Sequence, residues 1–204
     1  ERFGVNLVFD IVHGDEAATD EAFAKAAHIE HLAIKQNRVT ALSMEPRAAI
    51  GHYDPMGDRY SLWTSLQHPH MTRQWLAEHS LKAPEHKIRV VIPDVGGGFG
   101  QKCYHYPEDA TLLWASRKVG RPVRWTASRS ENLMVDTHAR DHDTTAKMAF
   151  DDQGRILGLR VSTLACCGAY LSPFATVIPA YAYGLILSGA YAIPAICARV
   201  RGVY

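Results

Sequence analysis

Residues 90–102 have the sequence VVIPDVGGGFGQK, the most informative stretch of the chain. The β-branched run at 88–92 predicts a short buried strand that ends at Pro93. Four of the five residues at 96–100 are glycine, so the backbone there can adopt positive φ angles and approach a ligand closely. Successive exposed N–H groups in such a loop can bind an anion or an oxo group. A purely structural turn is the alternative interpretation.

This glycine loop comes close to two phosphate-binding motifs and matches neither. A Walker A loop requires G-x-x-x-x-G-K-[ST], but Gln101 stands where the second glycine belongs and Cys103 stands at the hydroxyl position. The dinucleotide-binding pattern G-x-G-x-x-G fails at the same glutamine. An independent nucleotide or phosphate binder is therefore a weak hypothesis.

Before the loop, the pattern of apolar residues predicts mainly extended structure. The expected elements are a strand at 5–12, a short helix at 20–27 with an acidic first turn, and extended segments at 30–34 and 38–42 separated by a turn at Gln36-Asn37. Two apolar runs at 48–53 and 60–65 flank the sequence DPMGD, which predicts a hairpin. Pro69 is expected in the first turn of a helix.

After the loop, helices and strands alternate irregularly. Pro107 begins a helical pattern that runs to Val119 and is ended by Gly120. A strand follows at 123–127, and the runs 144–150 and 156–164 flank a second hairpin turn, DDQG. This order favours an α+β fold with mixed sheets, hairpins and packed helices. Because no repeat or low-complexity linker divides the sequence, we expect 1–204 to form a single unit.

The composition excludes several classes of protein. Of the 204 residues, 47% are hydrophobic and 21% are charged, which is typical of a well-cored globular chain and not of a disordered, collagen-like or coiled-coil one. Lys and Arg number 22 against 21 for Asp and Glu, a formal net charge of +1. Without a basic excess or a basic stripe, we expect no nucleic-acid partner.

Residues 161–198 contain no Asp, Glu, Lys or Arg, so they require a membrane test. Prolines and glycines interrupt the run, and no piece approaches the roughly 20 apolar residues of a spanning helix. We expect a buried strand-and-loop core and no membrane span. The four cysteines form no C-x-x-C pair and no secretory signal is visible, which predicts free thiols and a cytoplasmic protein.

Several separate segments, in one consistent order over about 37–204, resemble the molybdenum-binding large subunit of the xanthine oxidase, aldehyde oxidase and aerobic carbon monoxide dehydrogenase family. GGGFGQK looks like the glycine loop of that family. The other matching segments are MEPRAA at 44–49, LWTSLQHPH at 62–70, GRPVRW at 120–125, SRSE at 128–131, ARDH at 139–142 and the stretch 164–172. Ordered motifs of this kind are far more specific than a glycine loop alone. The resemblance implies the first part of a molybdopterin-binding domain.

The resemblance also implies roles for particular residues. In the family, a pterin dithiolene holds the molybdenum, and Gln67 matches a glutamine that approaches an oxygen or water-type ligand of the metal. An amide suits this role because its NH2 group donates without adding charge. The alternative is that Gln67 caps the helix at Pro69. Gly98, Phe99 and Gly100, with Gly97 beside them, match the loop that presents N–H groups near the metal.

Phe99 also has two interpretations, a wall of the substrate cavity or a hydrophobic anchor for the loop. No residue of this chain is assigned as catalytic or as a metal ligand. His68 and His70 form an H-x-H pair without a third ligand at motif spacing, which disfavours zinc. Glu108 and Asp109 are better explained as the acidic first turn of a helix than as an acid/base pair. Glu45 with Arg47, and Arg129 with Glu131, are candidate structural ion pairs.

For function, the resemblance implies oxidative hydroxylation of a carbon centre, or carbon monoxide oxidation, on a small-molecule substrate. The implied cofactor is molybdopterin cytosine dinucleotide with molybdenum, and the implied partners are iron–sulfur and FAD subunits or domains. The family's N-terminal domain and its C-terminal half, with the catalytic glutamate, have no counterpart here. We therefore expect that this chain alone neither retains the cofactor nor turns over substrate. The alternative is a non-catalytic assembly module that pairs with a separate chain, which predicts an exposed apolar face within 171–198.

Overall fold

The computed structural model describes residues 6–204, and the chain forms two units. One unit contains Ala139–Tyr204 together with the described residues up to Val39, and the other is Thr40–His138. We expected a single unit because the sequence shows no linker. The chain divides in two without one because the second unit is inserted between two adjacent strands of the first, at Val39 and Ala139.

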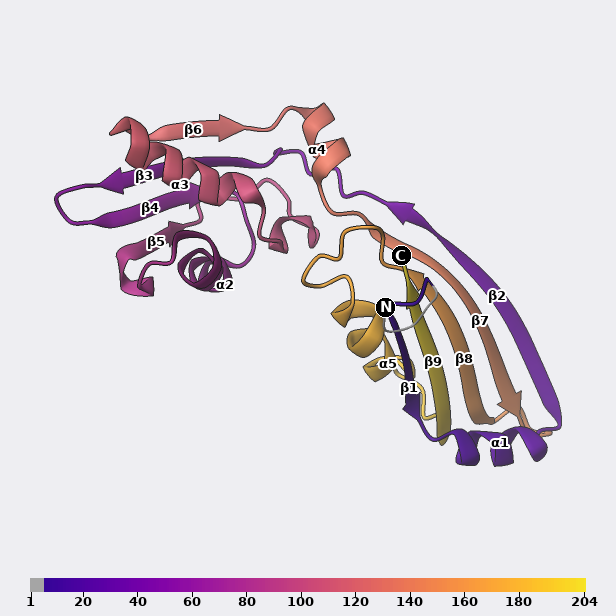
Figure 1. The fold of residues 1–204 in the computed structure, drawn as a ribbon. Helices are drawn as coiled ribbons and strands as arrows, with labels where there is room; N and C mark the ends of the chain where they lie inside the picture. Colours follow the sequence, from indigo (N-terminus) through magenta and orange to yellow (C-terminus); the bar gives the residue numbers. More distant parts are fainter. Residues whose placement is uncertain (1–5) are drawn as a thin grey trace. The chain divides into compact units, whose positions relative to one another are not determined.

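A five-stranded sheet forms the first unit (Figure 1). Its order is β1-β9-β8-β7-β2, and only the β8/β9 pair among these strands is parallel. The strands are β1 (Phe9–Gly14), β2 (His28–Val39), β7 (Ala139–Phe150), β8 (Ile156–Cys166) and β9 (Ala195–Val203). Helix α1 (Glu16–Ala24) runs across one end of the sheet, and the π-helix η4 (Ile178–Ala182) and α5 (Tyr183–Leu185) pack beside β9 (Figure 1).

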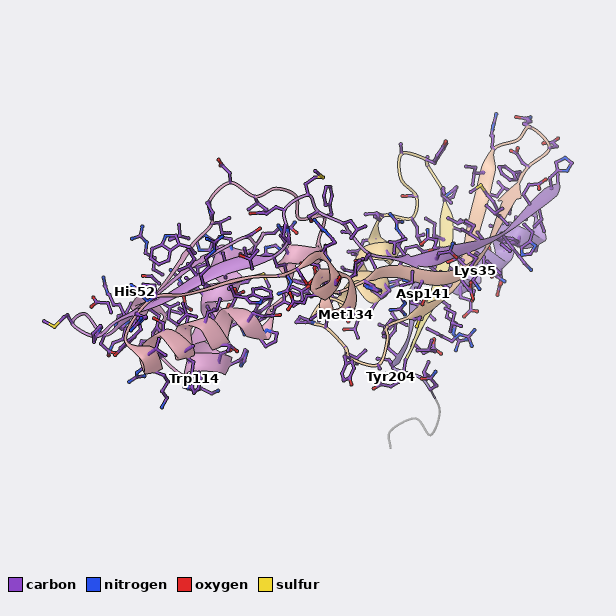
Figure 2. The ribbon with its side chains drawn as sticks, turned by 90° about the horizontal axis from the view of Figure 1, so that it is seen from above. Lys35, His52, Trp114, Met134, Asp141 and Tyr204 are labelled. Atoms are coloured by element: carbon purple, nitrogen blue, oxygen red, sulfur yellow. The ribbon has the colours of Figure 1, made fainter. Side chains whose placement is uncertain are left out.

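Local signals predicted part of this unit. The hairpin of β7 and β8 is confirmed, although both strands are longer than expected. The helix expected at 20–27 begins a turn earlier, at Glu16, because the Asp15 side chain caps it by accepting from the Ala18 N–H at 2.9 Å. The turn expected at Gln36-Asn37 is wrong, since β2 is one long strand that pairs with β7 along its length. Figure 2 shows Lys35 of β2 and Asp141 of β7 on these neighbouring strands.

The uncharged stretch 161–198 is only partly the buried core that we expected. Ala165, Ala180 and Ala195 are buried, but several large apolar side chains between β8 and β9 are exposed: Tyr170, Leu171, Val177, Ile178, Tyr181, Leu185, Ile186 and Tyr191. Within the described residues, no helix is both long enough and apolar enough to cross a bilayer. All four cysteines are free, as expected.

The second unit has a four-stranded sheet of order β5-β4-β3-β6, in which β4 and β5 are parallel. Its strands are β3 (Ala48–Asp54), β4 (Arg59–Thr64), β5 (Ile88–Val91) and β6 (Val123–Thr126). Its helices are α2 (Pro69–Trp75), the π-helix η1 (Leu76–Leu81), the 3-10 helices η2 (Glu85–Lys87) and η3 (Gln101–Cys103), α3 (Pro107–Val119) and α4 (Arg129–Val135). Two mixed sheets with packed helices confirm the predicted α+β class.

The core of this unit lies between α3 and the sheet. Leu62 on β4, Leu76 on η1 and Leu113 on α3 are fully buried there. Gly51 lets α3 approach β3, because a Cβ at this position would lie 2.6 Å from the backbone of Leu112. Trp114 lies on the outer side of α3 and is largely exposed (Figure 2).

The sequence predicted this unit well. The β3/β4 hairpin, the helix that begins at Pro69 and the helix Pro107–Val119 are all confirmed. Gly120 ends α3 in the left-handed conformation, with φ +68°. The strand at 88–92 is present as β5, but it is an edge strand in which only Ile88 is buried.

Candidate functional site

The glycine loop connects β5 to η3 and contains a series of unusual backbone conformations. Gly97 has φ +101° and Gly100 has φ +83°. Phe99 lies between them with φ +53°, a left-handed conformation that costs a non-glycine residue about 1–2 kcal/mol. Its side chain is 78% exposed. Phe99 is therefore held in a strained backbone while its ring projects into solvent.

Gln67 reaches the loop from the end of β4. Its Oε1 accepts the Gly100 N–H at 3.0 Å, and its own backbone N–H donates to the Lys102 carbonyl at 3.0 Å. The Gly100 contact fixes the orientation of the amide, because only the oxygen can accept. The Nε2 group of Gln67 is thereby left to donate elsewhere. The interpretation of Gln67 as a cap of the α2 helix is not supported, since its side chain points to the loop.

Each glycine of this site is required for a different reason. A Cβ at Gly98 would lie 2.4 Å from the Gln67 Oε1, and a Cβ at Gly97 would lie 2.8 Å from the Phe99 ring. At Gly100 there is open space, and the constraint is its positive φ alone. Within residues 6–204, the structure gives no acceptor to the N–H groups of Gly97, Gly98 and Phe99.

The Glu45 carboxylate contacts the residues at both ends of the loop, Gly96 and Lys102. Its Oε2 accepts the Gly96 N–H at 2.8 Å, the Ser65 hydroxyl at 2.5 Å and the Lys102 ammonium at 2.8 Å. Lys102 also donates to Ser65 Oγ at 2.6 Å, and its side chain is 1% exposed. Burial acts to raise the pKa of Glu45, but the hydrogen bonds from Lys102, Ser65 and Gly96 outweigh it and hold the pKa below its usual range.

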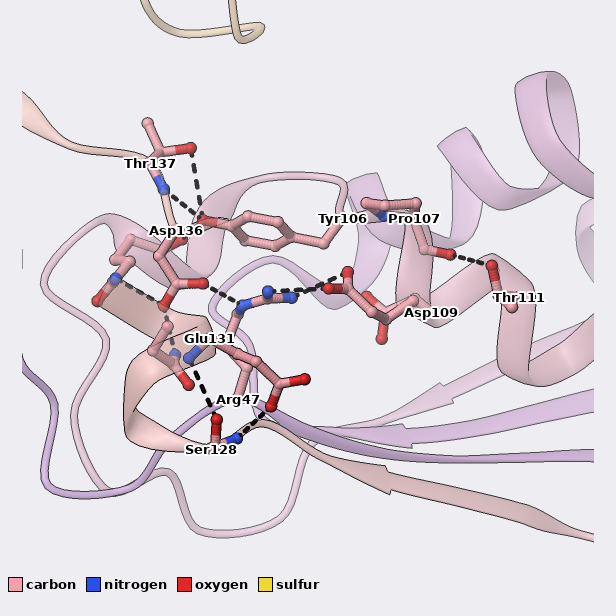
Figure 3. A network of polar contacts seen from close by, with 12 residues as sticks. Arg47, Tyr106, Pro107, Asp109, Thr111, Ser128, Glu131, Asp136 and Thr137 are labelled. Carbon is pink, nitrogen blue, oxygen red and sulfur yellow. Dashed lines mark hydrogen bonds and ion pairs between the residues drawn. The ribbon is translucent and has the colours of Figure 1, made fainter. Parts of the chain in front are cut away.

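A second buried network ties the far end of the loop to the helices (Figure 3). Arg47 donates from Nε to Asp136 at 2.6 Å and from both Nη atoms to Glu108 at 3.1 Å. The other oxygen of Asp136 accepts from Gln101 at 2.7 Å and from Asn132. Arg47 therefore connects Glu108 on α3 to Asp136 at the end of α4, and Asp136 in turn holds Gln101, the residue that follows Gly100.

Asp109 lies beside this network on the first turn of α3 and is buried. Burial raises its pKa to about 6, although a hydrogen bond from Thr64 at 3.1 Å and the charge of Arg47 oppose the shift. The acidic first turn expected at Glu108 and Asp109 is thus present. Both carboxyls also make tertiary contacts that the helix alone does not explain.

The ion pairs expected from neighbouring residues form differently. Glu45 does not pair with Arg47; the pairs are Glu45 with Lys102, and Arg47 with Asp136 and Glu108. Sequence proximity was misleading because Pro46 separates two side chains that enter different networks.

The pair expected between Arg129 and Glu131 is also replaced by other contacts. Arg129 donates to the Met44 carbonyl at 3.1 Å, and Glu131 accepts the Ser128 N–H at 2.6 Å in a capping box. The residues missed at the sequence level are therefore Lys102, Ser65 and Asp136. Lys102 carried one signal, as the single lysine next to the loop.

The donor set can be tested against an anionic or oxo-bearing group. Gln67 Nε2 and the N–H groups of the loop are donors without a formal charge, and Glu45, which touches the loop, uses its Oε2 for three donors of its own. The described part of the chain contains no cluster of three or more His, Cys, Asp or Glu side chains that could hold a metal ion directly. These residues fit a metal group that arrives with its own ligand and presents oxygen acceptors.

The sequence of this chain is similar to a known protein family and to large subunits of several enzymes. The family model of the molybdopterin cofactor-binding domain matches residues 2–204. The nicotine 6-hydroxylase large subunit of Paenarthrobacter nicotinovorans is 37% identical over 178 residues, which cover 86% of this chain and 22% of that protein. The carbon monoxide dehydrogenase large chain of Hydrogenophaga pseudoflava is 36% identical, covering 98% of this chain and 25% of that protein.

Among solved structures, quinoline 2-oxidoreductase from Pseudomonas putida 86 superposes with a TM-score of 0.87 at 34% identity. The match covers 99% of this chain and 26% of that one. A carbon monoxide dehydrogenase structure matches with a TM-score of 0.85 at 33% identity. The chain thus spans about a quarter of the length of each of these relatives.

Proposed function

This chain belongs to the molybdopterin cofactor-binding domain family, and from that premise we propose that it forms one wall of the molybdenum site in the large subunit of a molybdenum hydroxylase or carbon monoxide dehydrogenase. Residues 1–204 then make up a partial cofactor-binding domain. The reaction is the oxidative hydroxylation of a carbon centre, or the oxidation of carbon monoxide, on a small molecule.

One observation carries this proposal, the hydrogen bond from Gly100 N–H to Gln67 Oε1. It engages Oε1 of Gln67, so Nε2 is the atom left to donate, and within residues 6–204 the N–H groups of Gly97, Gly98 and Phe99 are likewise given no acceptor. An oxygen-bearing, negatively charged cofactor group is the natural acceptor for such a set of neutral donors.

When bound, the molybdenum cofactor supplies the redox chemistry. The chain's own residues bind and orient it. Gln67 donates from Nε2 to an oxygen acceptor of the cofactor without adding charge, and the glycine loop donates from its backbone. Because Phe99 is exposed and apolar, we assign it to the wall of the substrate cavity.

Glu45 is not the general base in this proposal. Three donors hold its carboxylate in the ionised form, and its depressed pKa makes it a poor acceptor of a substrate proton near neutral pH. In this proposal the Glu45 carboxylate holds the glycine loop through Gly96 and Lys102. We assign no residue of this chain as the general base.

The resemblance supports the finer details. We propose molybdopterin cytosine dinucleotide as the form of the cofactor, iron–sulfur and FAD subunits or domains as the electron-transfer partners, and a cytoplasmic location. We also propose that the chain alone does not retain the cofactor through purification and has no activity, because one wall supplies few of the contacts that a dinucleotide requires.

The test is a titration of the purified chain with molybdopterin cytosine dinucleotide, followed by pterin fluorescence. We expect weak, saturable binding that Gly98→Ala reduces at least tenfold, since the added methyl displaces Gln67. Equal binding by the two proteins, or none at millimolar cofactor, contradicts the proposed site. Near-stoichiometric molybdenum in the freshly purified chain contradicts the proposed failure to retain it.

A second candidate function is an assembly module that pairs with a separate chain. The exposed apolar side chains between β8 and β9 favour it, and Leu185 and Tyr191 are 79% and 72% exposed. Co-purification and size-exclusion chromatography test this candidate. A stable monomer that captures no partner argues against it.

A further inference from the structure

We propose that Lys102 and Glu45 are positioning residues that clamp the glycine loop and hold Gln67 against it. The purpose of this clamp rests on the proposed function, whereas its geometry does not. Neither residue was a candidate for the site, and neither donates directly to the cofactor in the proposal above. Their effect would pass through the loop and through Gln67.

The first step is that one carboxylate closes the loop. Glu45 and Gly96 make a reciprocal contact, in which the Gly96 N–H donates to Oε2 at 2.8 Å and the Glu45 N–H donates to the Gly96 carbonyl at 3.1 Å. The same Oε2 receives the ammonium of Lys102 from the other end of the loop. Gly96 and Lys102, at the two ends of the loop, thus both donate to one oxygen atom, Glu45 Oε2.

The second step is that Lys102 also controls where Gln67 lies. Its ammonium donates to the Ser65 hydroxyl at 2.6 Å, and its backbone carbonyl accepts the Gln67 N–H at 3.0 Å. Ser65 and Gln67 are two residues apart in the segment that follows β4. Lys102 therefore holds this segment at two points, while the Gln67 side chain returns to Gly100.

The third step concerns energy. The Lys102 side chain is 1% exposed, and removing an ammonium group from water costs several kcal/mol that its partners only offset. A buried ion pair is consequently weak evidence for stability, because an apolar side chain of similar volume often serves as well. Directional hydrogen bonds to Glu45 and Ser65 supply what an apolar side chain lacks, a defined register between the loop and Gln67.

The experiment uses the isotope-labelled chain of 204 residues without cofactor. The main variant is Lys102→Met in a Glu45→Gln background, which removes both charges together and leaves an amide that can accept from Gly96. We expect the side-chain amide resonances of Gln67 to move. We also expect the Gly100 amide, which donates to Gln67 Oε1, to exchange with solvent at least tenfold faster than in the parent chain.

Two control variants separate positioning from general destabilisation. Ile88→Val removes one buried methylene from the core of the same unit, and Lys82→Met removes an exposed lysine charge. Neither is expected to move the Gln67 side-chain resonances. If the double variant does not fold, Ser65→Ala removes one contact of the clamp and is expected to cause the same changes to a smaller degree.

Unchanged Gln67 resonances and unchanged loop exchange in a folded variant would overturn the proposal. Changes of equal size in Ile88→Val would also overturn it, because the effect would then be one of stability. The result is distinguishable from failure of the proposed function, which is tested by cofactor titration of the parent chain. If the parent chain binds no cofactor but the clamp variant loosens the loop, the positioning role stands and the molybdenum role does not.

Discussion

Gly98 packs against Gln67 so closely that a Cβ at residue 98 would lie 2.4 Å from the Gln67 Oε1 and Cδ atoms. Real Cβ contacts do not become this short, so Gly98→Ala forces either the loop or Gln67 to move. Because Gln67 is held at its backbone by Lys102, we expect the side chain to swing out and lose the Gly100 hydrogen bond. Loss of that contact and strain in the loop should lower the free energy of unfolding by about 1–3 kcal/mol.

Urea unfolding measures this change. All four tryptophans, Trp63, Trp75, Trp114 and Trp125, lie in the second unit, so their fluorescence reports on the unit that contains the loop. Gly154→Ala is a matched control in the first unit, with a positive φ and open space around the Cβ. It should leave the tryptophan transition unchanged. A Gly98→Ala transition that coincides with the parent one would contradict the predicted collision.

Asp109 predicts a pH dependence of stability. Burial raises its pKa in the folded chain to about 6, whereas an exposed aspartate titrates near 4. The folded state therefore binds the Asp109 proton more tightly than the unfolded state does. The stabilisation that this proton gives the folded chain is fully present below about pH 4 and is lost as the pH rises through about 6. A shift of two pKa units corresponds to about 3 kcal/mol at most. Asp109→Asn keeps an oxygen to accept from Thr64 and cannot ionise.

We therefore expect Asp109→Asn to be more stable than the parent chain above pH 6, and close to it at pH 4. Urea midpoints followed by tryptophan fluorescence at pH 4, 5, 6 and 7.5 provide the comparison. The gap between the two proteins should open with rising pH. A constant gap across this range would show that Asp109 does not titrate in this window.

Much of the second unit could be predicted because its signals are local. Pro107 and Gly120 mark both ends of α3, and DPMGD specifies the β3/β4 turn. The failure at Gln36-Asn37 has a physical cause in the first unit. Local turn preference there is weak, and β2 is kept as one continuous strand by its pairing with β7, whose residues are about a hundred positions away. Long-range pairing is invisible to a local pattern.

The candidate site shows the same division. The glycines at 96–100 predict a loop whose backbone can approach a ligand closely. Without the family resemblance, however, the sequence favours Gln67 as a helix cap over Gln67 as a site residue. The clamp of Glu45 and Lys102 joins residues 57 positions apart, and no spacing rule connects them. Only the family resemblance pointed to Gln67 beforehand. The structure adds the contact with Gly100, which explains why that glutamine faces the loop.

The buried network at Arg47 predicts a large loss of stability on removal of one partner. Asp136 has a fully buried carboxylate that accepts from Arg47, Gln101 and Asn132. Asp136→Ala leaves the arginine charge buried with a single carboxylate partner, Glu108, so we expect unfolding to become easier by about 3–5 kcal/mol.

The control for this change is Asp143→Ala. Asp143 pairs with Lys35 at 4.0 Å on the exposed surface of the first unit, where an ion pair is worth less than about 1 kcal/mol. Thermal unfolding of both variants, followed by circular dichroism, should show a large shift for Asp136→Ala and a small one for Asp143→Ala. Shifts of similar size would mean that the Arg47 network is no more important than a surface pair.

Gln67→Glu distinguishes the two roles of the Gln67 amide, in which Oε1 accepts from Gly100 and Nε2 donates to the proposed cofactor. A carboxylate oxygen can still accept the Gly100 N–H, so the loop should keep its conformation and its amide exchange rates. The variant loses the Nε2 donor and places a negative charge beside the proposed cofactor acceptor. We therefore expect at least tenfold weaker binding of molybdopterin cytosine dinucleotide in the pterin fluorescence titration, with urea stability nearly unchanged. Gln153→Glu, in the exposed β7–β8 turn, adds the same charge away from the site and should bind like the parent chain. If Gln67→Glu binds as tightly as the parent chain while Gly98→Ala does not, the loop alone recognises the cofactor and Gln67 serves only to support it.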